Sequence, residues 1–253
     1  MIYFALPIAA LLTAALSATV GMGGGMLLLA TMFCFMTHAE AIPAHACVQL
    51  VSNSTRTLAF LRHVDWRTFA RFALGTVPGS LVGLALLSRL GTPDTSEPWL
   101  KMLVGVYILV ALFLPRATDG RHRSRWWDFP LLGLVGGTAA FTVGAVGPLI
   151  APLFARRGFV KERLVATKAL CQSLLHVAKI PGFLYIRSYE NLETLGLITL
   201  VMAIVVIPGT LAGKRLLPHV SEQQFVLLYR LALLAAGLKV LFADGFCPLL
   251  RGA

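Results

Sequence analysis

The stretch that decides the fold is residues 21–56, GMGGGMLLLATMFCFMTHAEAIPAHACVQLVSNSTR, where a glycine cluster precedes an apolar helix with a polar face. The polar residues are three or four positions apart: His45, Gln49, Asn53 and Arg56. At about 100° per residue they fall on one side of a helix, within an arc of roughly 80°. Because polar and charged groups are costly inside a bilayer, such a face usually marks a pathway or a binding site.

The same arrangement recurs 123 residues later in a second polar face, formed by Lys168, Gln172, His176 and Lys179. The shift of 123 also aligns the first glycine cluster with residues 144–148, Gly-Ala-Val-Gly-Pro. With a shift of 130, PGSLVG at 78–83 matches PGTLAG at 208–213. The unit that repeats is therefore a glycine break followed by a cationic, hydrogen-bonding helix face.

The composition indicates an integral membrane protein. Of the 253 residues, 57% are hydrophobic and 13% are charged, and the mean hydropathy is +0.79. Long apolar stretches separated by short loops are typical of a polytopic helical membrane protein. The apolar N-terminus is expected to be the first span, because no small-residue cleavage site precedes a polar domain. We expect an all-α fold.

The apolar segments divide the chain into two halves of five segments each: 2–20, 22–37, 42–61, 67–89 and 98–115, then 127–143, 145–156, 162–186, 192–217 and 222–243. The predicted units are a first transmembrane repeat (1–115), a basic cytoplasmic linker (116–126), a second transmembrane repeat (127–243) and a C-terminal tail (244–253). Segments 22–37 and 145–156 are short for a hydrocarbon core that needs about 20 helical residues. Each is expected to be a broken or re-entrant helix.

The charges predict the topology. The net charge of +11 arises from Lys and Arg in short loops, as retention of basic residues in the cytoplasm produces, so nucleic acid is not an expected partner. The basic loops lie around Arg62–Arg71, in the linker, around Arg156–Arg163 and at Lys214-Arg215. Placing them inside puts both termini outside. Because five segments is an odd number, the two repeats are then inverted relative to each other.

The polar groups favour a small oxyanion as ligand. A glycine break leaves unpaired N–H groups at the start of the next helix, whose positive end attracts anions. All eleven Asp and Glu residues lie in loops or at segment edges, whereas a pathway for metal cations normally offers carboxylate oxygens. The candidate substrate-binding residues are Gly23, Gly24, Gly25, Gln49, Asn53, Arg56, Gly144, Gly147, Lys168, Gln172, His176 and Lys179.

These residues also have structural interpretations. Glycine clusters serve close helix packing in membranes, Arg56 and Lys179 could extend to the membrane surface, and the two glutamines could bond between helices. His45 and His176 are candidate proton carriers because histidine titrates near neutral pH, although a packing role stays open. The four cysteines lack metal-ligand spacing, and neither a metal nor a cofactor is expected.

Several motifs together resemble the TauE/SafE sulfite exporter family: the GMGGG cluster, the HxxxQxxxN helix followed by Arg62-His63-Val64-Asp65-Trp66, the PGSLVG segment and the weaker second copy. The resemblance extends from about Ala5 to Phe242. It implies a multi-pass protein of the bacterial inner membrane that moves sulfite, organosulfonates or related small anions. Inverted repeats of this kind imply alternating access by rocking of one repeat against the other.

The leading hypothesis is a secondary transporter of a small anion. Export is favoured, because an inside-negative potential assists outward movement of one negative charge by about 2.3 kcal/mol per 100 mV. An ion channel or cation carrier on the same fold and a membrane assembly factor stay open as alternatives. An enzyme is not expected, since paired carboxylates, a metal cluster and a Ser/His/Asp set are missing. Besides the anion and the lipid bilayer, a second copy of the chain (a homodimer) is a candidate partner.

Overall fold

The computed structural model describes residues 2–20, 23–89, 93–113, 125–157, 159, 161–185, 192–216, 230–231, 234–235 and 237–247. The first half contains α1 (Ile2–Val20), α2 (Gly24–Met32), α3 (His38–Ala59), the 3-10 turn η1 (Leu61–His63), α4 (Trp66–Arg89) and α5 (Pro93–Phe113). The second half contains α6 (Asp128–Thr142), α7 (Gly147–Arg156), α8 (Lys161–Tyr185), α9 (Leu192–Leu216) and the π-helical η2 (Lys239–Phe246).

The described residues form helices and no strand, which confirms the predicted all-α class. The described helices up to residue 216 follow the predicted apolar segments closely, and residues 222–229 of the tenth predicted segment lie outside the described residues. At 1.5 Å per residue, α2 and α7 are only about 14 and 15 Å long, so neither crosses a hydrocarbon core of about 30 Å by itself. The predicted basic linker lies outside the described residues up to position 124, as does the predicted tail beyond residue 247.

The last helix continues past residue 243, where the apolar segment was expected to end. In η2, Lys239 Nζ lies 2.7 Å from a carboxylate oxygen of Asp244. These two residues are five positions apart, which is the hydrogen-bond spacing of a π-helix. In the hydropathy pattern, Asp244 marks the end of the apolar segment. In the structure, its ion pair with Lys239 allows the helix to include it.

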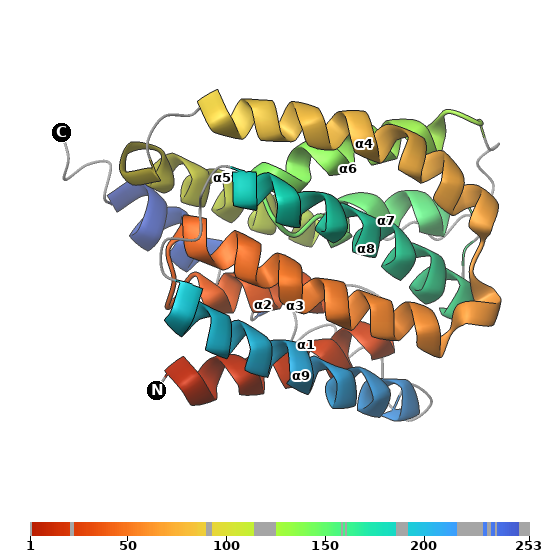
Figure 1. Cartoon of the computed structure of the whole chain (residues 1–253), viewed down its shortest axis with the longest axis horizontal. Helices are drawn as coiled ribbons and strands as arrows, with labels where there is room; N and C mark the ends of the chain where they lie inside the picture. Colours follow the sequence, from red (N-terminus) through yellow and green to blue (C-terminus); the bar gives the residue numbers. More distant parts are fainter. Residues whose placement is uncertain are drawn as a thin grey trace.

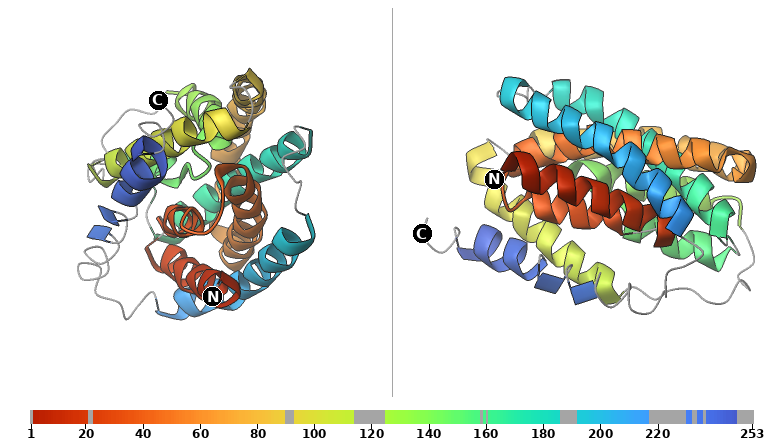
Figure 2. Two further views of the ribbon diagram at one scale, coloured as in Figure 1. Left: turned by 90° about the vertical axis from the view of Figure 1, so that its left-hand side faces the viewer. Right: turned by 90° about the horizontal axis from the view of Figure 1, so that it is seen from below.

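The long helices lie side by side along the length of the molecule (Figure 1). Their contacts give the order α1, α9, α3, α8, α4 and α6 across it. The view from below shows α1 and α9 against each other (Figure 2, right). The helices that carry the two polar faces, α3 and α8, are thus the central pair, and α5 packs along η2 beside them.

The helix contacts of one half have counterparts in the other. α1 packs on α9 as α6 packs on α4, and α9 packs on α3 as α4 packs on α8. Glycines make equivalent close approaches: a Cβ at Gly79 or Gly83 would meet the backbone of α6 at Leu134 or Thr138, and one at Gly209 or Gly213 would meet α1 at Leu11 or Ala15. These positions are related by the sequence shifts of 130 and 123.

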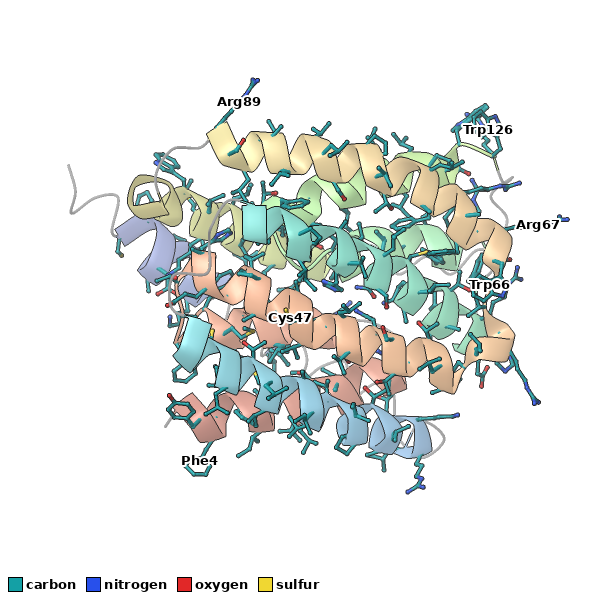
Figure 3. The ribbon with its side chains drawn as sticks, in the orientation of Figure 1. Phe4, Cys47, Trp66, Arg67, Arg89 and Trp126 are labelled. Carbon is teal, nitrogen blue, oxygen red and sulfur yellow. The ribbon has the colours of Figure 1, made fainter. Side chains whose placement is uncertain are left out.

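Large apolar side chains are exposed on the outside of the molecule, while three cationic side chains of the described residues are buried inside. Phe4 is 76% exposed and points outward (Figure 3). Arg56, Lys168 and Lys179 are 2%, 1% and 0% exposed, although soluble proteins almost never bury such groups unpaired. Within the described residues, two helices qualify as membrane spans by length and composition, Trp66–Arg89 and Gly196–Leu216, with shorter apolar helices at Tyr3–Thr19 and Pro98–Val110. This distribution fits an outer surface in contact with lipid.

Loops that were predicted to share one side of the membrane lie at one end of the molecule. Trp66, Arg67 and Trp126 are at this end and Arg89 is at the other (Figure 3). The Asp65 backbone N–H donates to Thr167 Oγ1 at 3.0 Å, and the Asp65 carboxylate pairs with Arg163. Lys214 Nζ also donates here, to the Ala59 carbonyl at 2.8 Å. We call this the basic end.

Candidate functional site

The polar faces sit halfway along the two central helices. α3 begins with a capping box, in which Thr37 Oγ1 accepts from the Glu40 N–H and the Glu40 carboxylate accepts from the Thr37 N–H. Gln49 is the twelfth of the 22 residues of α3, and Gln172 is the twelfth of the 25 residues of α8. Because α3 packs on α8, both amides lie near the centre of the molecule.

A cavity with an empty volume of about 340 Å³ lies between these helices and the beginnings of α2 and α7. Its lining residues are Ser17, Gly23, Gly25, Met26, His45, Gln49, Arg56, Ala145, Val146, Gly147, Pro148, Lys168, Gln172 and His176. The lining contains no carboxylate, and no group of three His, Cys, Asp or Glu residues in the described ranges is placed to hold a metal ion.

The structure brings eight of the twelve predicted binding residues to this cavity: Gly23, Gly25, Gln49, Arg56, Gly147, Lys168, Gln172 and His176. The predicted proton carrier His45 lines it too. The other four, Gly24, Asn53, Gly144 and Lys179, lie behind the lining. Asn53 Oδ1 accepts a hydrogen bond from Arg56 at 2.6 Å, Gly144 O accepts one from Lys179 Nζ, and Gly24 packs against the α1 backbone.

Glycine leaves room for the two central amides. A Cβ at Gly25 would lie 3.0 Å from Gln49 Oε1, and a Cβ at Gly147 would lie 3.2 Å from Gln172 Nε2. Just before these positions the backbone breaks at Gly23 (φ 96°) and Gly144 (φ 80°), in a conformation that L side chains rarely adopt. A positive-φ glycine followed by a glycine packed against a central glutamine therefore occurs at the start of α2 and at the start of α7.

The three buried cations differ in their partners. Arg56 bonds within its own helix, to Asn53 Oδ1 and to the Ser52 carbonyl at 3.3 Å. Lys179 donates to the Gly144 carbonyl at 2.8 Å. Within the described residues, Lys168 has neither a hydrogen bond nor an ion pair, although it lines the cavity. Burial shows that Arg56 and Lys179 do not extend to the molecular surface. Lys168 is the uncommitted positive charge of the site.

Two histidines face each other beside these cations. The His45 and His176 rings are 5.9 Å apart between centroids, at an interplanar angle of 73°. His45 Nε2 lies 2.8 Å from the Gly25 carbonyl oxygen. The Nδ1 atoms of both rings are buried, and neither has a hydrogen-bond partner in the described part of the chain. The site thus presents cations, amides and two unpaired imidazole nitrogens.

The comparison with protein families decides what kind of protein builds this site. The sequence model of the family "Sulfite exporter TauE/SafE" matches residues 6–240. The chain belongs to the TauE/SafE family. This match covers almost the entire length over which the sequence motifs resemble the family, so that resemblance is confirmed.

Two curated relatives support a membrane transporter. One is the "Probable membrane transporter protein YtnM" of Bacillus subtilis (strain 168), 24% identical over 201 residues that cover 75% of this chain and 67% of the relative. Another is the "Probable sulfite/organosulfonate exporter TauE" of Cupriavidus necator, 27% identical over 184 residues that cover 70% of this chain and 69% of the relative. The chain is therefore a membrane transporter of the TauE/SafE type.

Sequence reasoning missed several lining residues of this TauE/SafE protein. Ser17 is the clearest case: it comes from α1 and is the only described polar lining residue outside the two repeated motifs. Its equivalent at a shift of 123 is Ala140, so the repeat gave no signal for it. Met26, Ala145 and Val146 line the cavity through their position next to the glycine breaks, which hydropathy alone does not indicate.

Proposed function

We propose that this TauE/SafE protein is a secondary transporter that carries a small oxyanion, such as sulfite or an organosulfonate, across the bacterial cytoplasmic membrane, with export favoured. The observation that carries the proposal is the central cavity, whose charged lining residues are Arg56 and Lys168 and which has no carboxylate. An inside-negative potential assists the outward step of one negative charge by about 2.3 kcal/mol per 100 mV.

The charge balance of the cavity supports an anion. A buried cation is costly unless a counter-charge or hydrogen bonds compensate it. Lys168 has no such partner among the described residues, so an entering anion supplies the missing counter-charge. A cation entering the same space meets two like charges instead. The same observation argues against the cation-carrier alternative.

Hydrogen-bond donors around the cavity support the same ligand class. The amides of Gln49 and Gln172 line it, as do Gly25 and Gly147 in the first turns of α2 and α7. First-turn N–H groups have no partner within their helix, and the helix dipole is positive at this end. Two helix beginnings and two amides therefore complement the cations without adding a negative group.

The packing supports alternating access by two inverted repeats. When the two halves are exchanged, the contact between α1 and α9 corresponds to the contact between α6 and α4, and the contact between α3 and α8 corresponds to itself. The cavity is lined by residues of α3 and α8. Short helices that follow glycine breaks and meet at the centre are a recurrent transporter design. In this proposal α2 and α7 are the broken or re-entrant segments, and the basic end faces the cytoplasm.

The proposal is tested with the purified chain in liposomes, by measuring the flux of sulfite, sulfate and methanesulfonate. Lys168→Gln and Arg56→Gln should each reduce flux of the transported anion by at least about tenfold, the cost of one lost charged hydrogen bond. Arg89→Gln removes an equal charge from an exposed helix end and should leave flux unchanged. Wild-type flux in both cavity variants contradicts the proposed site, and a current that reverses at a cation equilibrium potential supports the channel alternative.

A further inference from the structure

We propose that the cavity selects monoanions that carry a hydrogen-bond donor next to the charged group, and that His45 Nδ1 is the atom that accepts from this donor. The inference rests on the proposed anion transport. Two observations carry it: the bond that fixes the proton on the other nitrogen of His45, and the absence of a partner for Nδ1 within the described residues.

The tautomer of His45 follows from its partner. The Gly25 carbonyl oxygen, 2.8 Å from His45 Nε2, can only accept a hydrogen bond. Nε2 must therefore carry the proton. In a neutral imidazole the other nitrogen is then an acceptor, which here is Nδ1. His45 is 1% exposed and Nδ1 is buried, so this acceptor finds neither a protein donor in the described chain nor bulk water.

The surroundings favour a neutral His45. Its charged neighbours are all positive: Arg56 on the same helix, and Lys168 and Lys179 on α8. His176 faces it across the cavity and Cys47 is nearby on α3, while α2 has no titratable side chain. Tyr107 of α5 and Lys214 of α9, on helices packed against α3, do not line the cavity. A proton on Nδ1 adds a like charge with no carboxylate to offset it.

The ligand that matches this cavity carries two kinds of group, negatively charged oxygens and a hydrogen-bond donor. Its negative oxygens are held by Lys168, Arg56 and the amides, and an N–H or O–H group donates to His45 Nδ1. Hydrogensulfite and sulfamate have both features, whereas the sulfite and sulfate dianions and simple alkylsulfonates have no donor. A site with a buried, unpaired acceptor rejects analogues that lack the matching donor more strongly than an apolar pocket rejects a change of size.

Sulfamate and methanesulfonate form a matched pair for the test, since both are tetrahedral monoanions and differ by an NH₂ or a CH₃ group. Binding to the purified full chain is measured by calorimetry at neutral pH. Neither ligand titrates there. We expect sulfamate to bind at least about tenfold more tightly.

His45→Phe should bring the affinity for sulfamate down to that for methanesulfonate. His63→Phe, which removes an exposed imidazole from η1, should change neither affinity. If His45→Phe does not fold, the wild-type comparison decides alone. Equal affinities in the wild type overturn the inference. If neither anion binds nor crosses liposomes, the proposed anion transport itself fails.

Discussion

Lys179 Nζ lies 2.8 Å from the carbonyl oxygen of Gly144, and both residues are buried. The cation is thereby tied to the positive-φ break that precedes α7. In the sequence repeat, the first-half equivalent of Lys179 is Arg56. In the structure, however, the residue that bonds to the first glycine cluster is His45, whose Nε2 contacts the Gly25 carbonyl oxygen. The two polar faces therefore bond to their glycine segments through residues at different repeat positions. Arg56 and Lys168 make no such bond and line the cavity.

Lys179 and Lys168 should respond differently to the same substitution. Lys168→Met removes the uncommitted charge of the cavity and should weaken anion binding by at least about tenfold. Lys179→Met removes a donor behind the cavity wall, leaves the Gly144 carbonyl unpaired, and should change affinity much less. Binding calorimetry on both variants makes the comparison. Equal losses of affinity contradict the division of roles between the two lysines.

Small side chains at Gly25 and Gly147 should block transport without unfolding the protein. A Cβ at either position lies within 3.0–3.2 Å of the central amide that faces it, so Gly25→Ala and Gly147→Ala displace Gln49 and Gln172. Anion flux in liposomes should fall in both. Gly136→Ala is the matched control, because a Cβ there meets only ordinary contacts at 3.6 Å or more. Unchanged flux in Gly25→Ala and Gly147→Ala is the contrary result.

Gly79 and Gly209 should be equally intolerant of a large side chain. Each approaches the backbone of the neighbouring helix, at Leu134 of α6 and at Leu11 of α1. Gly79→Leu and Gly209→Leu force these helices apart and should lower the thermal unfolding midpoint in detergent by several degrees, as overpacking by about 1–3 kcal/mol produces. Gly196→Leu is the control, since a Cβ at Gly196 has nothing within 4 Å.

The Asp65–Arg163 pair should make stability at the basic end depend on pH. Partial burial acts to raise the pKa of the Asp65 carboxyl, but the Thr68 N–H and Arg163 together lower it below its ordinary 3.8. Because the folded pKa is lowered, the contribution is complete above the unfolded value and is lost as the pH falls through the folded one.

Asp65→Asn should therefore lower the unfolding midpoint at neutral pH, and the difference from wild type should shrink once the pH falls below about 4. The measurement is thermal unfolding of both proteins across this range. The pair is partly exposed, so the neutral-pH difference should be small. A difference that grows toward acid pH contradicts the assignment.

Much of the site was predictable from residue types and spacing. Four polar positions on a 3.6-residue period place Gln49 and Arg56 on one helix face, and the shift of 123 gives Gln172 and Lys168 without any coordinates. Hydropathy likewise places the helices, because a bilayer requires apolar segments of a given length. Ser17 of α1 lies outside the repeated motifs, so this reasoning could not identify it as a cavity residue.

The sequence by itself therefore determined the helical class, the helix positions, the family and most of the cavity residues, since all of these depend on local period and composition. Only the tertiary structure decided which buried cation has no partner among the described residues. Hydrogen-bond geometry across the glycine breaks ties Lys179 to Gly144 and His45 to Gly25, and spacing along one helix cannot report which distant carbonyl a side chain meets. Among the described residues, that choice leaves Lys168 and His45 Nδ1 without a partner.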